Sequence, residues 1–70
     1  MSVWGALKAK VVLAALLRVG WRVKRRSGSH KVLERAGWPG FVFAFRDGEE
    51  IGPRMLPGIA RHTGLSPEFL

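Results

Sequence analysis

Residues 7–19 form an apolar segment that limits how the rest of the chain can fold. The segment is rich in Ala and Leu, contains no Gly or Pro, and is followed by Gly20. Glycine readily adopts the left-handed conformation that ends helices, so this pattern predicts a helix from Leu7 to Val19. Because its apolar side chains cover more than one narrow stripe, we expect the helix to be deeply buried.

The whole chain has 70 residues and no cysteine, so it needs one small core to hold it together. Domains of this size lie near the lower limit for folding without disulfides or metal ions. Hydrophobic residues make up 47% of the chain, which is enough for a packed core. We therefore predict a single domain over residues 1–70. The lack of cysteine excludes thiol chemistry and is compatible with a reducing compartment.

Three segments after the predicted helix have the patterns of β-strands. The predicted strands are residues 21–25, 30–36 and 41–45. In the first of them apolar and basic residues alternate, which places Trp21 and Val23 inward and Arg22 and Lys24 outward. Consecutive strands with short connections usually pair with each other, so we expect an antiparallel meander.

The last part of the chain predicts a loop and a second helix. Residues 46–52 are polar and acidic, and we expect a loop there. Pro53 is well placed to open a helix that ends near His62, with Gly64 as its stop. The expected fold is α+β in the order α-β-β-β-α, with two helices on one face of a three-stranded antiparallel meander.

The basic residues are unevenly distributed. The formal net charge is +7, and seven of the twelve Lys and Arg residues lie between Arg18 and Arg35, where Glu34 is the only acid. A clustered basic surface on a small domain favours nucleic acid over a small molecule as the ligand. An acidic protein partner would suit the same surface, and composition does not separate the two.

Membrane insertion is not expected. The longest apolar run, residues 11–17, is far shorter than the roughly 20 residues of a membrane-spanning helix. Arg18 follows this run where a signal peptide would have a small-residue cleavage site. We expect a cytoplasmic protein.

Residues 24–35 contain the groups that metal-free RNA cleavage needs. Such cleavage requires a base for the ribose 2′-OH, cations for the developing negative charge, and an acid for the leaving oxygen. His30 is the only histidine beside the basic residues, so it is the candidate base or acid. The candidate RNA-binding residues are Lys24, Arg25, Arg26, Ser27, Gly28, Ser29, Lys31 and Arg35.

Simpler structural explanations exist for these residues. His30 can be a strand-end histidine that faces water, and the basic run can be a solvated strand face. His62 falls in the last turn of the predicted second helix, where the helix dipole favours a cation, so we do not assign it to catalysis. Trp38, in the turn before the third strand, is the aromatic residue that we would test for contact with bases.

No metal ion or small-molecule cofactor is expected. Asp47, Glu49 and Glu50 are close in sequence, but they lack a histidine at ligand spacing and match no metal-binding loop. A solvated loop explains them better.

The order of these features resembles the HicA toxin family, small messenger-RNA interferases with a double-stranded-RNA-binding-like fold. The resemblance runs over nearly the whole chain: the first helix with Gly20-Trp21, the basic strand, Gly28-Ser29-His30, Pro53 with Leu56 and Ile59, and residues 64–70. It implies a toxin that cleaves single-stranded mRNA with His30 and is held inactive by a HicB-type antitoxin.

The chain differs from the family pattern at three places. Lys31 stands where many members have a second histidine, and Arg46 falls near a position where a histidine is common. Residues 53–56 replace the usual Pro-Gly-Thr-Leu. The fold resemblance and the replacement of histidines by Lys31 and Arg46 suggest one alternative, a non-catalytic RNA-binding module. The basic face leaves another alternative open, an interaction protein that binds an acidic partner.

Overall fold

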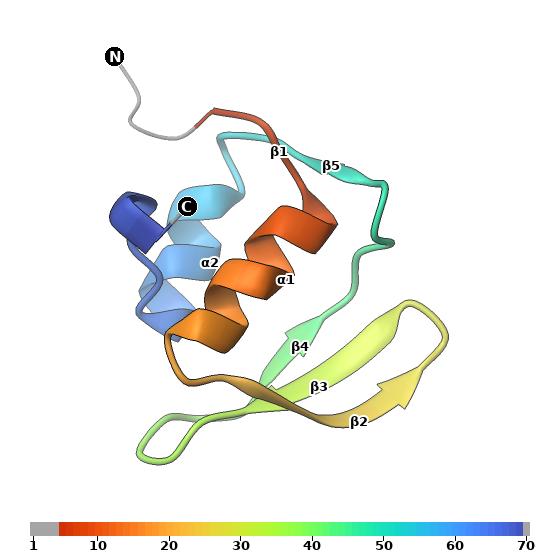
Figure 1. Cartoon of the computed structure of the whole chain (residues 1–70), viewed down its shortest axis with the longest axis vertical. Coiled ribbons are helices and arrows are strands. Elements are labelled where there is room, and N and C mark those ends of the chain that lie inside the picture. The colour runs from red at the N-terminus through yellow and green to blue at the C-terminus, as the bar shows by residue number, and fades with distance from the viewer. Residues whose placement is uncertain (1–4, 70) are drawn as a thin grey trace.

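The computed structural model of the chain describes residues 5–69 and contains two helices on one side of a sheet (Figure 1). Its elements are β1 (Leu7–Lys8), α1 (Ala9–Arg18), β2 (Arg22–Ser27), β3 (His30–Glu34), β4 (Phe41–Phe43), β5 (Glu50–Ile51), α2 (Leu56–Thr63) and the 3₁₀ turn η1 (Pro67–Phe69). Strands β2, β3 and β4 pair antiparallel in that order. The predicted α+β fold, a meander with both helices on one face, is confirmed. This is the double-stranded-RNA-binding-like arrangement.

The first helix begins two residues later than predicted. Leu7 and Lys8 are extended and pair antiparallel with Ile51 and Glu50, so β1 and β5 form a separate two-stranded sheet. The prediction of a plain loop over residues 46–52 was therefore wrong at β5. A two-residue strand is too short to show alternation, and its partner lies far away in sequence.

Backbone groups of the segment between β4 and β5 cap the start of α1. The N-cap residue Lys8 makes no side-chain hydrogen bond that caps this helix. Instead the Ala9 N–H donates to the carbonyl oxygen of Glu49 at 2.7 Å, and the Lys10 N–H donates to that of Asp47 at 3.1 Å. Two of the helix's unpaired N–H groups are satisfied in this way. The contact also holds residues 47–49 against α1.

The core lies between the helices and the sheet. Its buried residues are Ala9, Val12, Ala15, Leu16, Trp21, Leu33, Phe43, Ile51, Leu56, Ile59 and Leu65. The inward position of Trp21 is confirmed, and Val23 is partly buried beside it. Arg22 and Lys24 are exposed, as the alternation predicted.

The carbonyl oxygen of Thr63 joins the end of α2 to the sheet. It accepts a hydrogen bond from Nε1 of Trp21 at 2.8 Å and another from Nη1 of Arg35 at 3.3 Å. Thr63 is fully buried, and its hydroxyl donates to the carbonyl oxygen of Ile59 at 2.6 Å. The buried indole N–H of Trp21 and the buried hydroxyl of Thr63 thus both find partners, as burial requires.

The second helix ends where predicted but starts later. It begins at Leu56 rather than near Pro53, and Pro57 lies in its first turn, where the missing N–H costs no helical bond. Gly64 ends it with φ of 75°. No helix within residues 5–69 has the length and hydropathy needed to cross a membrane.

Candidate functional site

The β2–β3 hairpin brings most of the predicted site residues into one element. Its strands pair from Arg22 opposite Glu34 to Ser27 opposite His30, and the two residues Gly28 and Ser29 form the turn. Gly28 has φ of 59°. A positive φ at the first turn residue is typical of type II′ hairpins and favours glycine there. His30 is therefore fixed at the start of β3.

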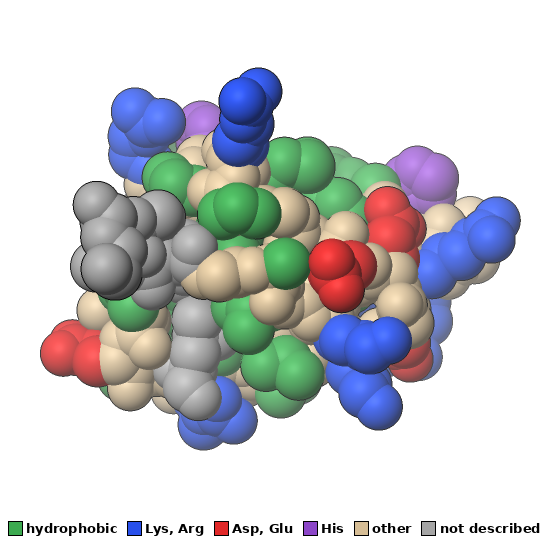
Figure 2. Space-filling view, turned by 90° about the horizontal axis from the view of Figure 1, so that it is seen from above, with side chains coloured by type: hydrophobic (Ala, Val, Ile, Leu, Met, Phe, Trp, Pro, Cys, Tyr) green, Lys and Arg blue, Asp and Glu red, His purple; other side chains and the backbone are tan. Residues whose placement is uncertain are grey.

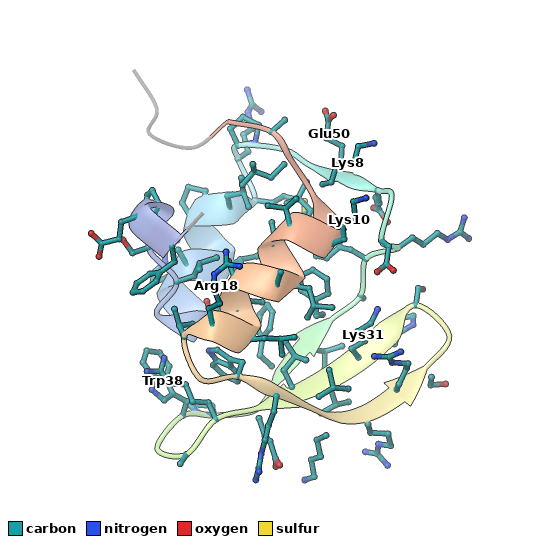
Figure 3. The ribbon with its side chains drawn as sticks, viewed as in Figure 1. Lys8, Lys10, Arg18, Lys31, Trp38 and Glu50 are labelled. Atoms are coloured by element: carbon teal, nitrogen blue, oxygen red, sulfur yellow. The ribbon has the colours of Figure 1, made fainter. Side chains whose placement is uncertain are left out.

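Strand alternation places His30 and Lys31 on opposite faces of the sheet. Leu33 and Lys31 are buried on the side that faces the helices, and Lys31 is only 7% exposed. Its side chain points from β3 towards α1 (Figure 3). His30 is exposed and shares the other face, which no helix covers, with Val32 and Glu34. We call this uncovered side the open face.

A β-bulge at Lys24 decides which way the basic residues of β2 face. Val23 pairs with Leu33 and Arg25 pairs with Val32, so Lys24 is an extra residue between the two pairs. Lys24 and Arg25 are both exposed. Because cross-strand partners lie on the same face, Arg25 belongs to the open face with Val32.

Arg26, opposite Lys31, belongs to the helix side of the sheet. A pocket lies there beside the hairpin turn. Its polar lining consists of Arg26, Gly28, Ser29, Lys31, Arg46 and Asp47, and Leu13 of α1 closes one side. We call it the basic pocket.

The charges in the basic pocket do not cancel. Nζ of Lys31 lies 3.9 Å from Oδ1 of Asp47, which is too far for a hydrogen bond. Asp47 is the only acidic residue among the described residues that line the pocket, against three cations. The pocket is therefore suited to an anion such as a phosphate group.

Local hydrogen bonds hold Arg46 and Asp47 in the basic pocket. The Arg46 N–H donates to Oε1 of Glu49 at 3.2 Å, and the Glu49 N–H donates to the carbonyl oxygen of Arg46 at 2.9 Å. Sequence reasoning did not place these two residues in the site. The one signal was the resemblance, which marks Arg46 as a position where a histidine is common.

Arg35 does not join the hairpin tip. It follows the end of β3, the opposite end from His30. Its guanidinium carbon lies 4.8 Å from the centre of the Trp38 ring, and Nη1 donates to the Thr63 carbonyl. Of the eight predicted RNA-binding residues, Arg35 thus lies away from the hairpin turn, and it shares a groove with Lys24 alone of the other seven.

The remaining titratable candidates lie elsewhere. The His62 ring stacks on Phe41, with ring centres 6.4 Å apart. Asp47, Glu49 and Glu50 are exposed, and residues 5–69 contain no group of three or more His, Cys, Asp or Glu side chains able to hold a metal ion.

The hairpin differs in charge from the face on the other side of the molecule. Residues 22–31 carry five basic residues and no acid. Seen from above, the far face shows acidic side chains beside basic ones, with hydrophobic groups between them (Figure 2). Residues 22–31 thus carry +5 of the formal net charge of +7.

Comparison with known protein families gives a match over most of the chain. A family model described as the HicA toxin of bacterial toxin–antitoxin systems matches residues 9–65. These residues include both helices, the three-stranded sheet and the hairpin. No curated protein and no solved structure matches the chain significantly.

Proposed function

The chain belongs to the HicA toxin family of bacterial toxin–antitoxin systems, and from this premise we propose that it is an endoribonuclease that cleaves mRNA without a metal ion. The observation that carries the proposal is the position of His30. It is exposed at the end of a hairpin whose charged residues are all basic between Arg22 and Lys31. A histidine that moves a proton beside bound phosphate is what such cleavage needs.

His30 acts in this proposal as the general base or acid. Arg25 lies on the same face, two residue pairs along the hairpin, and supplies positive charge for the phosphate that reacts. The basic pocket around Lys31 binds a neighbouring phosphate on the other side of the hairpin turn. One histidine cannot serve as acid and base at the same time, so water or a neighbouring cation completes the proton transfers.

The partner of the protein in this proposal is a HicB-type antitoxin. Covering the hairpin would block access to His30 and neutralise the basic surface in one contact. The proposed place of action is the cytoplasm, where mRNA is available.

One observation favours a second function, a non-catalytic RNA-binding module. Lys31 and Arg46 replace residues that are often histidine in the family, and both line the basic pocket. Lys and Arg bind phosphate through their positive charge, which is what a module that only binds RNA needs. This function predicts RNA binding that weakens with salt and leaves the RNA intact.

The test compares the wild-type protein with two histidine variants on an unstructured RNA in EDTA. We expect His30→Ala to reduce the cleavage rate by about 10²-fold or more, because a proton-transfer group is lost. His62→Ala is the matched control and should cleave at the wild-type rate. Circular dichroism confirms that each variant is folded.

Two results contradict the proposal in different ways. If His30→Ala cleaves as fast as the wild-type protein, His30 is not the catalytic residue. If the wild-type protein binds RNA but yields no products, the RNA-binding module is the correct function.

A further inference from the structure

A groove lies at the edge of the sheet, at the end opposite the hairpin turn. The residues that matter for its chemistry are Arg22, Lys24, Val32, Glu34, Arg35 and Trp38. We call it the Trp38 groove. Neither the family match nor the proposed function gives it a role.

Trp38 presents a fixed aromatic surface in this groove. Its backbone N–H donates to the carbonyl oxygen of Arg35 at 3.1 Å, which closes the turn between β3 and β4. The Arg35 guanidinium lies 4.8 Å from its ring centre, and Trp21 meets the ring edge-to-face at 6.1 Å. Trp38 is still 37% exposed. A ring held in place yet accessible binds a planar group with little loss of side-chain entropy.

The charge of the groove favours an anionic ligand that also has an aromatic part. Nε of Arg22 pairs with Oε1 of Glu34 at 3.1 Å, and Glu34 is the only acid among the described residues that line the groove. Lys24 and Arg35 remain as excess positive charge. An aromatic surface beside uncompensated cations suits a nucleotide, whose base stacks and whose phosphate pairs with a cation.

Two groove residues, Val32 and Glu34, share the open face with His30, whereas the Trp38 ring lies at the edge of the sheet beside Trp21 and Gly64. His30, Val32 and Glu34 alternate along β3 with the inward residues Lys31 and Leu33. Four residue steps separate His30 from Glu34, about 13 Å along a strand. Trp38 and Lys31 lie at opposite ends of the sheet in Figure 3. The distance of about 13 Å from His30 to Glu34 corresponds to about four stacked nucleotides, and to fewer nucleotides in an extended strand.

We propose that the Trp38 groove binds a base of the RNA a few nucleotides away from the bond that is cleaved. The base stacks on the indole of Trp38, and Lys24 pairs with the phosphate of the same strand. This inference rests on the proposed function, because it assigns a second contact to the same RNA. Its consequence is a minimum substrate length: an RNA too short to span from His30 to Trp38 loses this contact.

The experiment uses the full chain with His30→Ala as the parent, so that RNA is bound without being cut. Affinity is measured for an unstructured RNA of eight nucleotides and for a dinucleotide. We expect Trp38→Leu in this parent to weaken binding of the longer RNA by about tenfold or more, since stacking is lost. Trp38→Phe should retain most of the affinity, because it keeps an aromatic face.

Phe69→Leu is the matched control. Phe69 is 41% exposed, similar to Trp38, but it lies in η1 and not in the groove. Its replacement should leave the affinity for both RNAs unchanged. Melting temperatures show whether each variant is folded.

A cross-linking measurement tests the contact without replacing Trp38. An eight-nucleotide RNA with one 4-thiouridine, placed at each position in turn, is irradiated with the His30→Ala protein and digested with trypsin. At one position we expect the cross-link in the peptide of residues 36–46, which contains Trp38.

The outcomes separate the inference from the proposed function. A folded Trp38→Leu protein that binds the longer RNA as tightly as its parent overturns the inference, as do cross-links confined to other peptides. In either case RNA binding itself still supports the proposed function. A parent that binds no RNA overturns the proposed function and the inference together.

Discussion

Gly64 is the residue whose replacement the structure forbids most clearly. Its φ is 75°, and a Cβ atom added there would lie 2.8 Å from Cη2 of Trp38. A side chain at this position has to adopt a left-handed conformation and push the indole away. We expect Gly64→Ala to lower the free energy of unfolding by about 2–4 kcal/mol, which combines the backbone cost with that of overpacking. Urea denaturation measures the change.

Gly58 provides the control for this prediction. It lies inside α2, and a Cβ atom added there meets nothing within 4 Å. Alanine is the better helix former, so Gly58→Ala should raise the free energy of unfolding by up to about 1 kcal/mol. Equal effects of the two substitutions would contradict the special role of Gly64.

At the same scale, the sequence placed His30 at the start of a strand but did not orient its neighbour. The Ser-Gly-Ser segment predicted the turn, which the structure confirms at Gly28 and Ser29. Lys31 was placed with the phosphate-binding residues on charge alone. Counting back two positions from the apolar Leu33 would have predicted that Lys31 faces inward. Its partner Asp47 was out of reach of such counting, because it lies in another part of the chain.

At the scale of elements, the bulge in β2 sets the bend and the twist of the hairpin, and so the direction in which its side chains point. Deleting Lys24 keeps Arg25 opposite Val32 but removes the extra residue, so the strand loses its local bend and added twist. We expect the deletion variant to fold, with cleavage slowed by about 10²-fold because small misplacements of reacting groups are costly. Circular dichroism and the cleavage assay measure the two effects.

Lys24→Ala is the control for the deletion. It keeps the bulge and should cleave far faster than the deletion variant. Equal cleavage rates in the deletion variant and in Lys24→Ala would show that the bulge does not position the reacting groups.

Long patterned elements were predictable, and short or irregular ones were not. The helix before Gly20 and the three strands were predicted from composition and alternation. The pairing of β1 with β5 was missed, because a strand of two residues is too short to show an alternating pattern. The bulge was missed as well, since a strand with one inserted residue still reads as alternating over residues 21–25. The start of α2 shifted to Leu56, because Pro53 fits a turn as well as a helix start.

At the scale of the whole molecule, the direction of the positive charge can be tested through salt dependence. The logarithm of RNA affinity falls with the logarithm of salt concentration by about 0.7 for each phosphate of a single strand that the protein neutralises. We expect a slope of about −3 for the His30→Ala protein if about four cations contact phosphate. Replacing Arg25 and Arg26 with Gln should reduce this slope by about 1.4.

Lys8 and Lys10 are the control residues for the replacement of Arg25 and Arg26. Both are exposed, but they lie at the β1 end of α1, away from the hairpin (Figure 3). Replacing them with Gln removes the same net charge and should leave the slope unchanged. Equal changes for both pairs would indicate attraction to the overall charge of the protein instead of a defined site.

The whole-molecule arrangement was only partly predictable. Layering and topology followed from the order of elements and short connections. The basic pocket could not be predicted, because it joins the hairpin to Leu13 of α1 and to Arg46 and Asp47 after β4. Such a site depends on how three distant segments pack, which local patterns do not encode.

The hydrogen bond from Trp21 to Thr63 has a consequence for the lifetime of the protein in a cell. It joins residues 42 positions apart and ties the end of α2 to the start of the sheet. If a protease pulls α2 away, Leu56 and Ile59 leave the core, and the Trp21 indole loses the acceptor of its N–H group. A trimmed fragment that keeps the hairpin would therefore have no stable fold. We therefore expect a protease that removes α2 to degrade the rest of the chain as well.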